Sequence, residues 1–465
     1  MEKARTKRKH DSIIRFVKGL NVLLIALPFI ICWMGYYAER TWAPYYAKGN
    51  YLLIAIFMLL YITYGHIYDA FFISLSKISE IVYSQSLAAL VSDGIMFVIT
   101  WLLTKKFPAI WPILLVFIAQ VILSIVWAKA ANTWYFRTFP PKRTAVIYDT
   151  RAGMKNLIRE YGLDSKFKIE HTVSVTECIH RELKVLKGME VVFLCDLHSH
   201  DRNIILKHCV AENIDVYVIP RIGDVLMNSA RQMHMFHLPI LRVKRYSPRI
   251  EYLVMKRGFD ILVSGLGLII ASPIMVFTAI AIKAYDRGPV FYKQCRLTKD
   301  GATFDVLKFR SMKVDAEKDG VARLSTGDKD DRITPIGKWI RKTRVDELPQ
   351  LINILKGEMS LVGPRPERPE IAAQYEETLP EFKLRLQAKA GLTGYAQVYG
   401  KYNTTPYDKL QMDLMYISKP GMLEDIRILF ATVKILFMPE STEGVAEGQT
   451  TASSNRMNIE TEVEI

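Results

Sequence analysis

Long uncharged stretches near the start of the chain most restrict the folds that are open to it. Three of them, residues 19–38, 49–68 and 107–128, contain no Asp, Glu, Lys or Arg, and one more, 84–104, contains a single acid. About 20 apolar residues form a helix long enough to span the hydrocarbon core of a bilayer. Inside that core a helix satisfies its own backbone hydrogen bonds, which an open strand cannot do. The sequence therefore predicts four transmembrane helices within residues 1–135.

Charged residues indicate how these helices lie in the membrane. Five basic residues occupy positions 3–9, and Lys129 and Arg137 follow the last stretch. Because cytosolic loops of membrane proteins are enriched in Lys and Arg, both ends of the four-helix domain are predicted to face the cytosol. The single acid is Asp93, which we expect near the cytosolic end of its helix. The alternative is a buried functional acid, since acids inside a membrane are costly.

Composition and cysteine spacing exclude several classes of protein. Half of the residues are hydrophobic and the formal net charge is +15, which together suit a membrane protein with a water-facing part. The basic charge favours lipid or phosphorylated partners over nucleic acid, because no zinc-finger spacing or aromatic RNA-binding motif is present. The five cysteines include no Cys-x-x-Cys pair, so neither a zinc site nor a disulfide framework is predicted.

Residues 144–245 change to an alternation of strand-like and helix-like segments. The apolar segments that predict strands are 145–148, 168–175, 191–195 and 215–219. Strands that alternate with helices are typical of a parallel α/β domain. A dinucleotide-binding domain needs a G-x-G-x-x-G turn after its first strand, but residues 149–153 contain one glycine. We therefore interpret the domain as a degenerate Rossmann-like fold with a structural or regulatory role.

A further uncharged run, residues 261–282, has Ser272 and Pro273 near its middle. Proline removes one helical hydrogen bond and clashes with the preceding turn, so a kink is predicted there. Basic residues flank the run on both sides, at positions 256, 257, 283 and 287. A helix over 258–284 that enters one leaflet, bends at the proline and returns would leave both flanks in the cytosol. The alternative is a simple kinked span.

The acidic pair Asp346–Glu347 precedes a short amphipathic helix predicted over residues 348–355. Apolar residues recur there at helical spacing, Pro349 is tolerated only in a first turn, and a Lys-Gly pair ends the helix. Asp346 is expected at or near the N-cap, where the helix dipole keeps it ionised and able to attack phosphorus. Glu347 projects about 100° away and is suited to bind Mg²⁺. The alternative is an ordinary acidic helix start.

Basic residues in the same region are candidates to bind phosphate. Lys308 and Arg310 are two residues apart in a strand-like segment, so they would share one face and grip a diphosphate. Arg365 lies between two prolines, whose fixed φ angles stiffen the loop and preorganise the arginine. The glycine-containing turn at 391–397 could approach a ligand closely. For each arginine or lysine the alternative is solvated surface charge.

Five motifs occur in the order that characterises one protein family. They are GPVFYKQ (288–294), KFRSM (308–312), DELPQ (346–350), LVGPRP (361–366) and GLTG (391–394). With them, residues 252–438 resemble the bacterial sugar transferases, also called monotopic phosphoglycosyl transferases. The segments ahead of them resemble the N-terminal parts of the large members, which act as polyprenyl-phosphate hexose-1-phosphate transferases in exopolysaccharide and capsule synthesis.

The resemblance implies a fold in three parts. They are a membrane α-helical domain at 1–135, a degenerate Rossmann-like α/β domain at 144–245, and an α+β monotopic catalytic domain at 252–438. The last part would carry the re-entrant membrane helix 258–284, with its break at Ser272 and Pro273. Residues 439–465 are polar and are predicted to be disordered.

The site residues of the family map onto this chain one by one. Asp346 corresponds to the catalytic aspartate of an Asp-Glu dyad, and Glu347 corresponds to the glutamate that holds Mg²⁺. Arg365 matches an arginine that contacts the nucleotide sugar, and Arg341 matches a basic residue that contacts phosphate. Asp413 matches a C-terminal motif of the family. Two segments outside the dyad depart from the usual pattern, at 295–297 and 389–391.

The resemblance implies an undecaprenyl-phosphate hexose-1-phosphate transferase. Such an enzyme moves hexose-1-phosphate from a UDP-hexose to polyprenyl phosphate through a covalent phosphosugar-aspartate, as the first membrane step of exopolysaccharide or capsule synthesis. Its expected place is the bacterial inner membrane, with several membrane passes and a cytoplasmic catalytic domain. Mg²⁺ is the expected cofactor, a homodimer is left open, and no nucleic acid is expected. The large members favour glucose or galactose as the sugar.

Two other functions compete with this prediction. A membrane-bound nucleotide-sugar dehydratase or epimerase also joins four membrane helices to an α/β domain. It needs an intact glycine turn and a Tyr-x-x-x-Lys pair inside that domain, whereas Tyr252 and Lys256 of this chain lie outside it. The other alternative is a non-catalytic scaffold for polysaccharide assembly, and the intact dyad and arginines argue against it.

Overall fold

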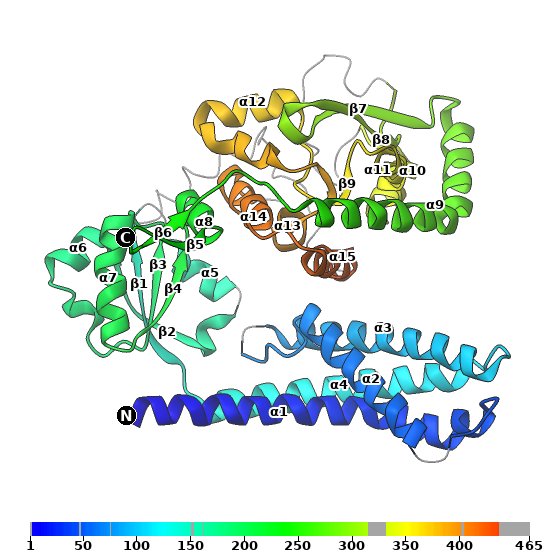
Figure 1. The fold of residues 1–465 in the computed structure, drawn as a ribbon, viewed down its shortest axis with the longest axis horizontal. Helices are drawn as coiled ribbons and strands as arrows, with labels where there is room; N and C mark the ends of the chain where they lie inside the picture. Colours follow the sequence, from blue (N-terminus) through cyan, green and yellow to red (C-terminus); the bar gives the residue numbers. More distant parts are fainter. Residues whose placement is uncertain are drawn as a thin grey trace. The chain divides into compact units, whose positions relative to one another are not determined.

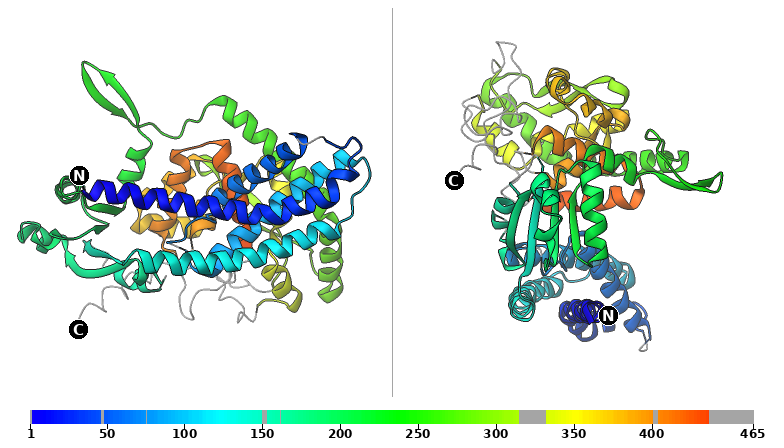
Figure 2. Two further views of the ribbon diagram at one scale, coloured as in Figure 1. Left: turned by 90° about the horizontal axis from the view of Figure 1, so that it is seen from below. Right: turned by 90° about the vertical axis from the view of Figure 1, so that its left-hand side faces the viewer.

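The computed structural model describes residues 2–45, 48–74, 76–149, 153–160, 162–314, 332–400 and 404–436. The predicted disordered tail at 439–465 lies outside these described residues. The chain forms two compact units, Met1–Val218 and Ile219–Ile465. Figure 1 and Figure 2 show the ribbon of each unit.

Long apolar helices make up most of the first unit. They are α1 (Glu2–Cys32), α2 (Lys48–Ile67), α3 (Ile78–Thr104) and α4 (Trp111–Thr138). All four are long and apolar enough to span a membrane, so the four long apolar helices that the sequence predicts are present and the chain is a membrane protein. α4 packs against both α1 and α3, and α2 packs against α3. α1 continues into a π-helical turn at Trp33–Tyr37.

Asp93 lies in the middle of α3, so the expectation that it lies near a helix end is wrong. The acid is the sixteenth residue of this 27-residue helix, and it is also near the middle of the apolar stretch 84–104. Its side chain is buried, with Gln120 Nε2 3.5 Å from Asp93 Oδ1. Gln120 Nε2 also donates to the Ile25 carbonyl at 3.2 Å. The acid therefore faces the bundle interior, where polar partners reduce its cost, and Gln120 joins α1, α3 and α4.

A parallel sheet forms most of the rest of the first unit, as the sequence predicts. Its strands are β1 (Lys142–Tyr148), β2 (Phe167–Ser174), β3 (Val191–Cys195) and β4 (Asp215–Ile219), in the order β2-β1-β3-β4. β1 pairs in parallel with both β2 and β3. One apolar cluster joins β1 and β3 to α6 (Val175–His180) and α7 (Ser199–Ala211), and another joins β2 to α5 (Met154–Glu160). Sheet faces covered by helices are typical of α/β folds.

The second unit combines short strands with helices. Its elements are α8 (Ile222–Asn228), β5 (Arg231–Met235), β6 (Leu238–Arg242), α9 (Ile250–Asp286), β7 (Phe291–Leu297), β8 (Thr303–Phe309), α10 (Pro335–Lys342), α11 (Gln350–Lys356), β9 (Ser360–Val362), α12 (Pro369–Thr378), β10 (Gly391–Thr393), α13 (Tyr395–Tyr399), α14 (Pro406–Ser418) and α15 (Met422–Leu436). β7 pairs with β8 antiparallel, and β9 pairs with β10 in parallel. One core cluster joins residues of α8, α11, β9, α12 and α14.

The long helix α9 contains Pro273, and Figure 1 shows its ribbon changing direction before it leads into β7. Proline has no N–H, so the carbonyl of Ile269 loses its usual helical donor. Ser272 Oγ donates to that carbonyl at 2.8 Å and replaces the missing bond. The Ser-Pro pair therefore permits a bend without an unsatisfied carbonyl, which agrees with the predicted kink. α9 is also long and apolar enough to cross a membrane.

Three glycines allow two backbone segments to meet at the edge of the β9–β10 pair. A Cβ atom on Gly391 would lie 2.1 Å from the Gly363 nitrogen, and one on Gly394 would lie 2.2 Å from the Gly363 oxygen. Such separations are far below van der Waals contact, so no other residue fits at 391 or 394 without a backbone shift. The turn at 391–394 thus approaches the backbone at Gly363. The sequence had suggested that this turn approaches a ligand, and that stays a prediction.

Replacing Gly391 with alanine is expected to destabilise the second unit by about 3 kcal/mol, because the new methyl group would overlap backbone atoms of Gly363. Gly421→Ala is the matched control, since nothing lies within 4 Å of a Cβ atom there. Thermal unfolding of both purified variants in detergent measures the difference. Equal unfolding midpoints for the two variants would contradict the close approach.

Candidate active site

The Asp346–Glu347 pair lies on a 3₁₀ turn, Val345–Glu347, that precedes α11. The predicted helix start at Asp346 is therefore wrong, because α11 begins at Gln350 with Pro349 as its N-cap. Proline has no N–H to donate to the Val345 carbonyl, and the N–H of Leu348 donates to that carbonyl instead, at 3.2 Å. The two acids are thus held by a tight turn and not by the first turn of a helix.

Three cations surround the carboxylate of Glu347, one from the same turn and two from distant parts of the second unit. Lys308 Nζ lies 3.2 Å and Arg365 Nη2 lies 3.9 Å from Glu347 Oε1. Arg344 Nη1 lies 3.8 Å from Glu347 Oε2. Burial works to raise the pKa of Glu347, but these three cations outweigh it and hold that pKa below its usual range. Glu347 is therefore ionised at neutral pH.

Asp346 has a different environment from its neighbour. Burial, followed by the charge of Glu347, raises the pKa of Asp346 above the usual range for an aspartate, and the opposing pull of Lys308 and Arg341 is smaller. Burial therefore weakens the ionisation that the sequence led us to expect at this position. Adjacent acids whose pKa values are pushed apart are typical of pairs that divide two chemical roles between them.

A metal ion at this turn would have the Glu347 carboxylate as its protein ligand, with Asp346 next to it in the chain. Mg²⁺ is usually bound by one or two carboxylates together with substrate phosphates and water. No group of three or more His, Cys, Asp or Glu side chains that could hold a metal occurs among the described residues. The donor set therefore fits a Mg²⁺ ion that takes most of its ligands from the substrate, and does not fit a cage built by the protein alone.

The loop that carries Arg365 is fixed by its own carbonyl groups. Residues 364 to 367 each direct a carbonyl to a donor from elsewhere in the second unit. The donors are, in order, Gly391 N–H (2.9 Å), Arg385 Nη2 (2.7 Å), Arg296 Nη1 (3.1 Å) and Leu297 N–H (2.9 Å). Because four successive carbonyls are held, the backbone of Arg365 is preorganised, as its two flanking prolines predict. The side chain of Arg365 is 43% exposed and can reach a ligand.

Asp413 contributes to this loop through Arg385. Arg385 Nε donates to Asp413 Oδ2 at 2.8 Å, and both side chains are buried. The same guanidinium lies 3.8 Å from Glu367 Oε1. Burial raises the pKa of Asp413, and Arg385 opposes this shift. The geometry therefore links Asp413 to the Arg365 carbonyl through one arginine, and a direct substrate contact by Asp413 stays a prediction.

Arg310 contacts a different partner from Lys308. Its guanidinium binds both oxygens of Asp286 at the end of α9, with 2.6 Å between Nη1 and Oδ2, and its Nε donates to the Pro289 carbonyl at 2.7 Å. β8 ends at Phe309, so the regular alternation of side chains along a strand does not extend to Arg310. The structure does not bring the two cations to one partner, and phosphate binding by Arg310 stays a prediction.

Tyr252 and Lys256, the pair that a dehydratase would need, are engaged in packing. Tyr252 Oη donates to Asp425 Oδ2 at 2.9 Å, and Lys256 Nζ lies 2.8 Å from the same oxygen. Tyr416 Oη donates to the other oxygen of Asp425 at 2.9 Å. This buried group joins α9, α14 and α15, which gives the Tyr-x-x-x-Lys spacing a structural reason.

Two arginines that the sequence did not single out hold the Arg365 loop in place. Arg385 is buried beside Asp413, and Arg296 bonds to the Pro366 carbonyl. For Arg385 a signal exists in the sequence, because it interrupts the apolar residues Leu384 and Leu386. A charge in such a position is rarely buried without a partner. The partner itself cannot be located from the sequence, because it lies on another helix.

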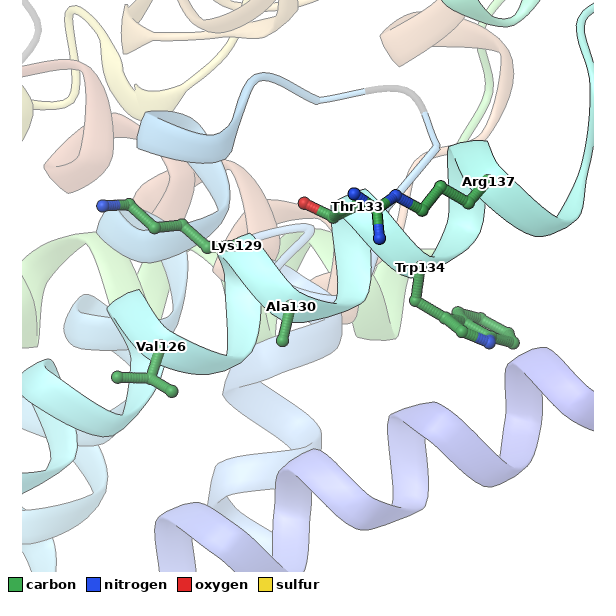
Figure 3. Close-up of a pocket in the computed structure, with 6 residues that line it drawn as sticks. All are labelled: Val126, Lys129, Ala130, Thr133, Trp134 and Arg137. Atoms are coloured by element: carbon green, nitrogen blue, oxygen red, sulfur yellow. The ribbon is translucent and has the colours of Figure 1, made fainter.

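A depression on the surface of the first unit has no acidic pair surrounded by cations such as the one at Asp346 and Glu347. It is lined by Val126, Lys129, Ala130, Thr133, Trp134 and Arg137 (Figure 3). All six residues belong to α4, and none is acidic. Cations and an indole ring near the end of a membrane helix are typical of the membrane–water interface. The depression therefore fits the membrane surface better than a catalytic site.

The second unit is similar to known proteins. Residues 251–439 match the family described as bacterial sugar transferase. A UDP-N-acetylgalactosamine-undecaprenyl-phosphate N-acetylgalactosaminephosphotransferase of Aeromonas hydrophila is 36% identical over 234 residues, which cover 50% of this chain and 54% of that protein. A UDP-glucose:undecaprenyl-phosphate glucose-1-phosphate transferase of Klebsiella pneumoniae is 41% identical over 246 residues, or 51% and 52% of the two chains.

A shorter relative is matched almost completely. An exopolysaccharide production protein of Rhizobium leguminosarum bv. phaseoli is 42% identical over 190 residues, which cover 39% of this chain and 94% of that protein. This chain therefore belongs to the bacterial sugar transferase family, and the resemblance seen in the motifs is confirmed. The chain spans about half the length of the Aeromonas and Klebsiella relatives.

Replacing Arg385 with Met should destabilise the fold, whereas replacing Arg365 with Met should not. The Arg385 side chain is 3% exposed, and its loss would leave the Asp413 carboxylate buried without a counter-charge, at a cost of about 3–5 kcal/mol. Arg365 is largely open to solvent and its ion pair with Glu347 is long, so we expect a change of about 1 kcal/mol or less. Thermal unfolding in detergent compares the two variants. Similar losses of stability would contradict the roles assigned to these arginines.

Proposed function

We propose that this member of the bacterial sugar transferase family moves hexose-1-phosphate from a UDP-hexose to undecaprenyl phosphate or a similar polyprenyl phosphate. The reaction would begin exopolysaccharide or capsule synthesis at the membrane. The observation that carries this proposal is the Asp346–Glu347 pair with Lys308, Arg344 and Arg365 around it. The Aeromonas and Klebsiella relatives, whose names specify sugar phosphate transfer to undecaprenyl phosphate, support it.

Asp346 is the nucleophile in this mechanism. A carboxylate oxygen of Asp346 attacks the phosphorus that carries the sugar, the P–O bond to UMP breaks, and UMP leaves with the bonding electrons. The resulting phosphosugar-aspartate divides one difficult displacement into two easier ones. An oxygen of the polyprenyl phosphate then attacks the same phosphorus, and the Asp346 carboxylate leaves. The lipid product carries the sugar through a diphosphate.

Cations around the pair bind the diphosphate and stabilise the charge that grows on the leaving phosphate. Lys308 and Arg365 contact Glu347, and Arg341 acts on Asp346 through its charge. Fixed cations stabilise a transition state most when they need no rearrangement as the reaction proceeds. The held carbonyls of the Arg365 loop meet this requirement. Phosphate binding by Arg310 and substrate contact by Asp413 remain part of this proposal, with Arg310 paired to Asp286 and Asp413 paired to Arg385 before substrate binds.

Glu347 is the residue that would hold Mg²⁺, with phosphate oxygens of the substrate as further ligands. Bound there, the ion would neutralise charge on the diphosphate and polarise the reacting phosphorus. Lys308 pairs with Oε1 of Glu347 and Arg344 pairs with Oε2. These two ion pairs fix the orientation of the carboxylate.

We also propose that residues 252–438 form a cytoplasmic catalytic domain and that α9 is its re-entrant anchor. The change of direction of α9 in Figure 1, the proline inside this helix, and exposed apolar side chains such as Ile269 and Phe277 support this topology. The Rhizobium relative, which consists almost wholly of the matched segment, supports a catalytic domain that functions without the first unit. The α/β sheet of the first unit would then have a structural or regulatory role.

A transfer assay with purified protein, polyprenyl phosphate and a panel of UDP-sugars tests the function and identifies the sugar. Asp346→Asn should lower transfer by about 10³-fold or more, because the covalent route is lost. Asp300→Asn is the matched control, since Asp300 is an exposed aspartate of the same unit and should keep full activity. Full activity in Asp346→Asn would contradict the mechanism, and no transfer from any UDP-sugar would favour a scaffold.

Cysteine labelling tests the topology of α9. In a background without the five native cysteines, Glu251→Cys and Ala284→Cys lie in exposed positions near the two ends of α9. A re-entrant helix leaves both on the cytosolic side, so a membrane-impermeant thiol reagent should label neither in intact cells and both after permeabilisation. Labelling of position 284 alone in intact cells would mean that α9 spans the membrane.

A further inference from the structure

Arg344 has a backbone conformation that its residue type disfavours. Its φ is +57°, in the left-handed region where Gly and Asn occur far more readily than a long side chain. The residue joins α10 to the turn of the acidic pair. Its N–H donates to the Arg341 carbonyl at 3.1 Å, and its carbonyl accepts from the Glu347 N–H at 3.2 Å. These backbone hydrogen bonds explain the left-handed conformation at position 344. They do not explain why an arginine occupies this position.

The side chain of Arg344 supplies that reason. Its Nη1 lies 3.8 Å from Glu347 Oε2, while Lys308 occupies the opposite oxygen, Oε1. At 3.8 Å the contact is an ion pair and is longer than a hydrogen bond, so a phosphate oxygen could enter between or beside the two groups. One third of the Arg344 side chain is exposed, which leaves it within reach of a ligand.

The charges around the acidic pair favour an anionic ligand. Lys308, Arg341, Arg344 and Arg365 are the cations that act on these two carboxylates. Arg344 is one of two residues in this group, with Lys308, that act on both. Four positive charges against two negative charges leave a surplus, and a diphosphate or a phosphate monoester would neutralise it.

We propose that Arg344 is a further phosphate-binding residue, whose guanidinium contacts a phosphate oxygen of a substrate bound beside Glu347. The disfavoured backbone conformation is retained because it directs this side chain toward the reacting groups. The inference rests on the proposed function. The phosphate is that of the nucleotide sugar or that of the lipid, and both offer the same oxygens to the guanidinium.

Arg344→Asn separates a binding role from a structural one. Asparagine tolerates the left-handed region better than arginine, so the variant should unfold at the same temperature or a higher one. Its rate in at least one half-reaction should nevertheless fall about tenfold or more, as expected for a lost bond to a charged group. Arg344→Lys, which keeps the charge, should recover part of that rate.

Arg287→Asn is the matched control. Arg287 also has a φ of +57°, at the end of α9, and is exposed. Its replacement should give the same or higher thermal stability and unchanged rates. Both variants replace an arginine that has a left-handed backbone conformation. A difference between them therefore reports the loss of the guanidinium beside Glu347 and not the change in backbone strain.

The two half-reactions identify the source of the phosphate. Slower adduct formation from UDP-sugar assigns Arg344 to the nucleotide phosphate, and slower transfer of a preformed adduct to polyprenyl phosphate assigns it to the lipid. Unchanged rates in both half-reactions would overturn the proposal. So would a lower unfolding temperature with no recovery in Arg344→Lys, since that result indicates a structural role.

Equilibrium binding of UDP to the wild type and to Arg344→Asn keeps this inference separate from the proposed function. A wild-type protein that binds UDP but forms no adduct and transfers no sugar would refute the proposed function. In that case UDP binding weakened about tenfold in Arg344→Asn would still support the inference for the nucleotide phosphate, and equal binding of both UDP and polyprenyl phosphate by the two proteins would refute it as well.

Discussion

The ion cluster around Glu347 is the interaction on which the rest of the site depends. A carboxylate pair with little access to water is unfavourable unless opposite charges compensate it. Each compensating cation comes from a different element: Lys308 from β8, Arg344 from the turn after α10, and Arg365 from the loop after β9. Arg344 belongs to the same local turn as Glu347, and the fold of the second unit brings Lys308 and Arg365 to this carboxylate. In the proposed function, the positive surplus that results is what attracts phosphate to the site.

The membrane-compatible helix α9 supplies the frame for these elements. Arg257 donates to the last carbonyls of α11 at 2.6 and 2.7 Å, and a cation there also complements the helix dipole. Asp260 accepts hydrogen bonds from the first residues of β9 at 2.8 and 3.1 Å. Lys256 pairs with Asp425 of α15. The helix that would meet the lipid is therefore bonded directly to the elements that flank the acidic pair and the Arg365 loop.

Local patterns in the sequence predicted much of this structure, and tertiary contacts decided the rest. Uncharged stretches located the long apolar helices, because a segment inside a bilayer must pair all its backbone N–H and C=O groups and a helix does so within itself. The expected position of Asp93 was wrong, although the acid is already near the middle of the apolar stretch 84–104. The sequence singled out the acidic pair, but its placement at the N-cap was wrong because Pro349 interrupts the bonding pattern. Arg385 could not be assigned, because its role depends on a partner 28 residues away that only the fold brings close.

The covalent role of Asp346 is the central claim, and one measurement tests it most directly. The protein is incubated with a UDP-sugar that it uses, without any lipid acceptor, and its mass is then determined intact and by peptide mapping. The account predicts an added sugar phosphate on Asp346, released when polyprenyl phosphate is supplied. Rapid transfer to lipid by a protein that never carries this mass, or an adduct on any other residue, would contradict it.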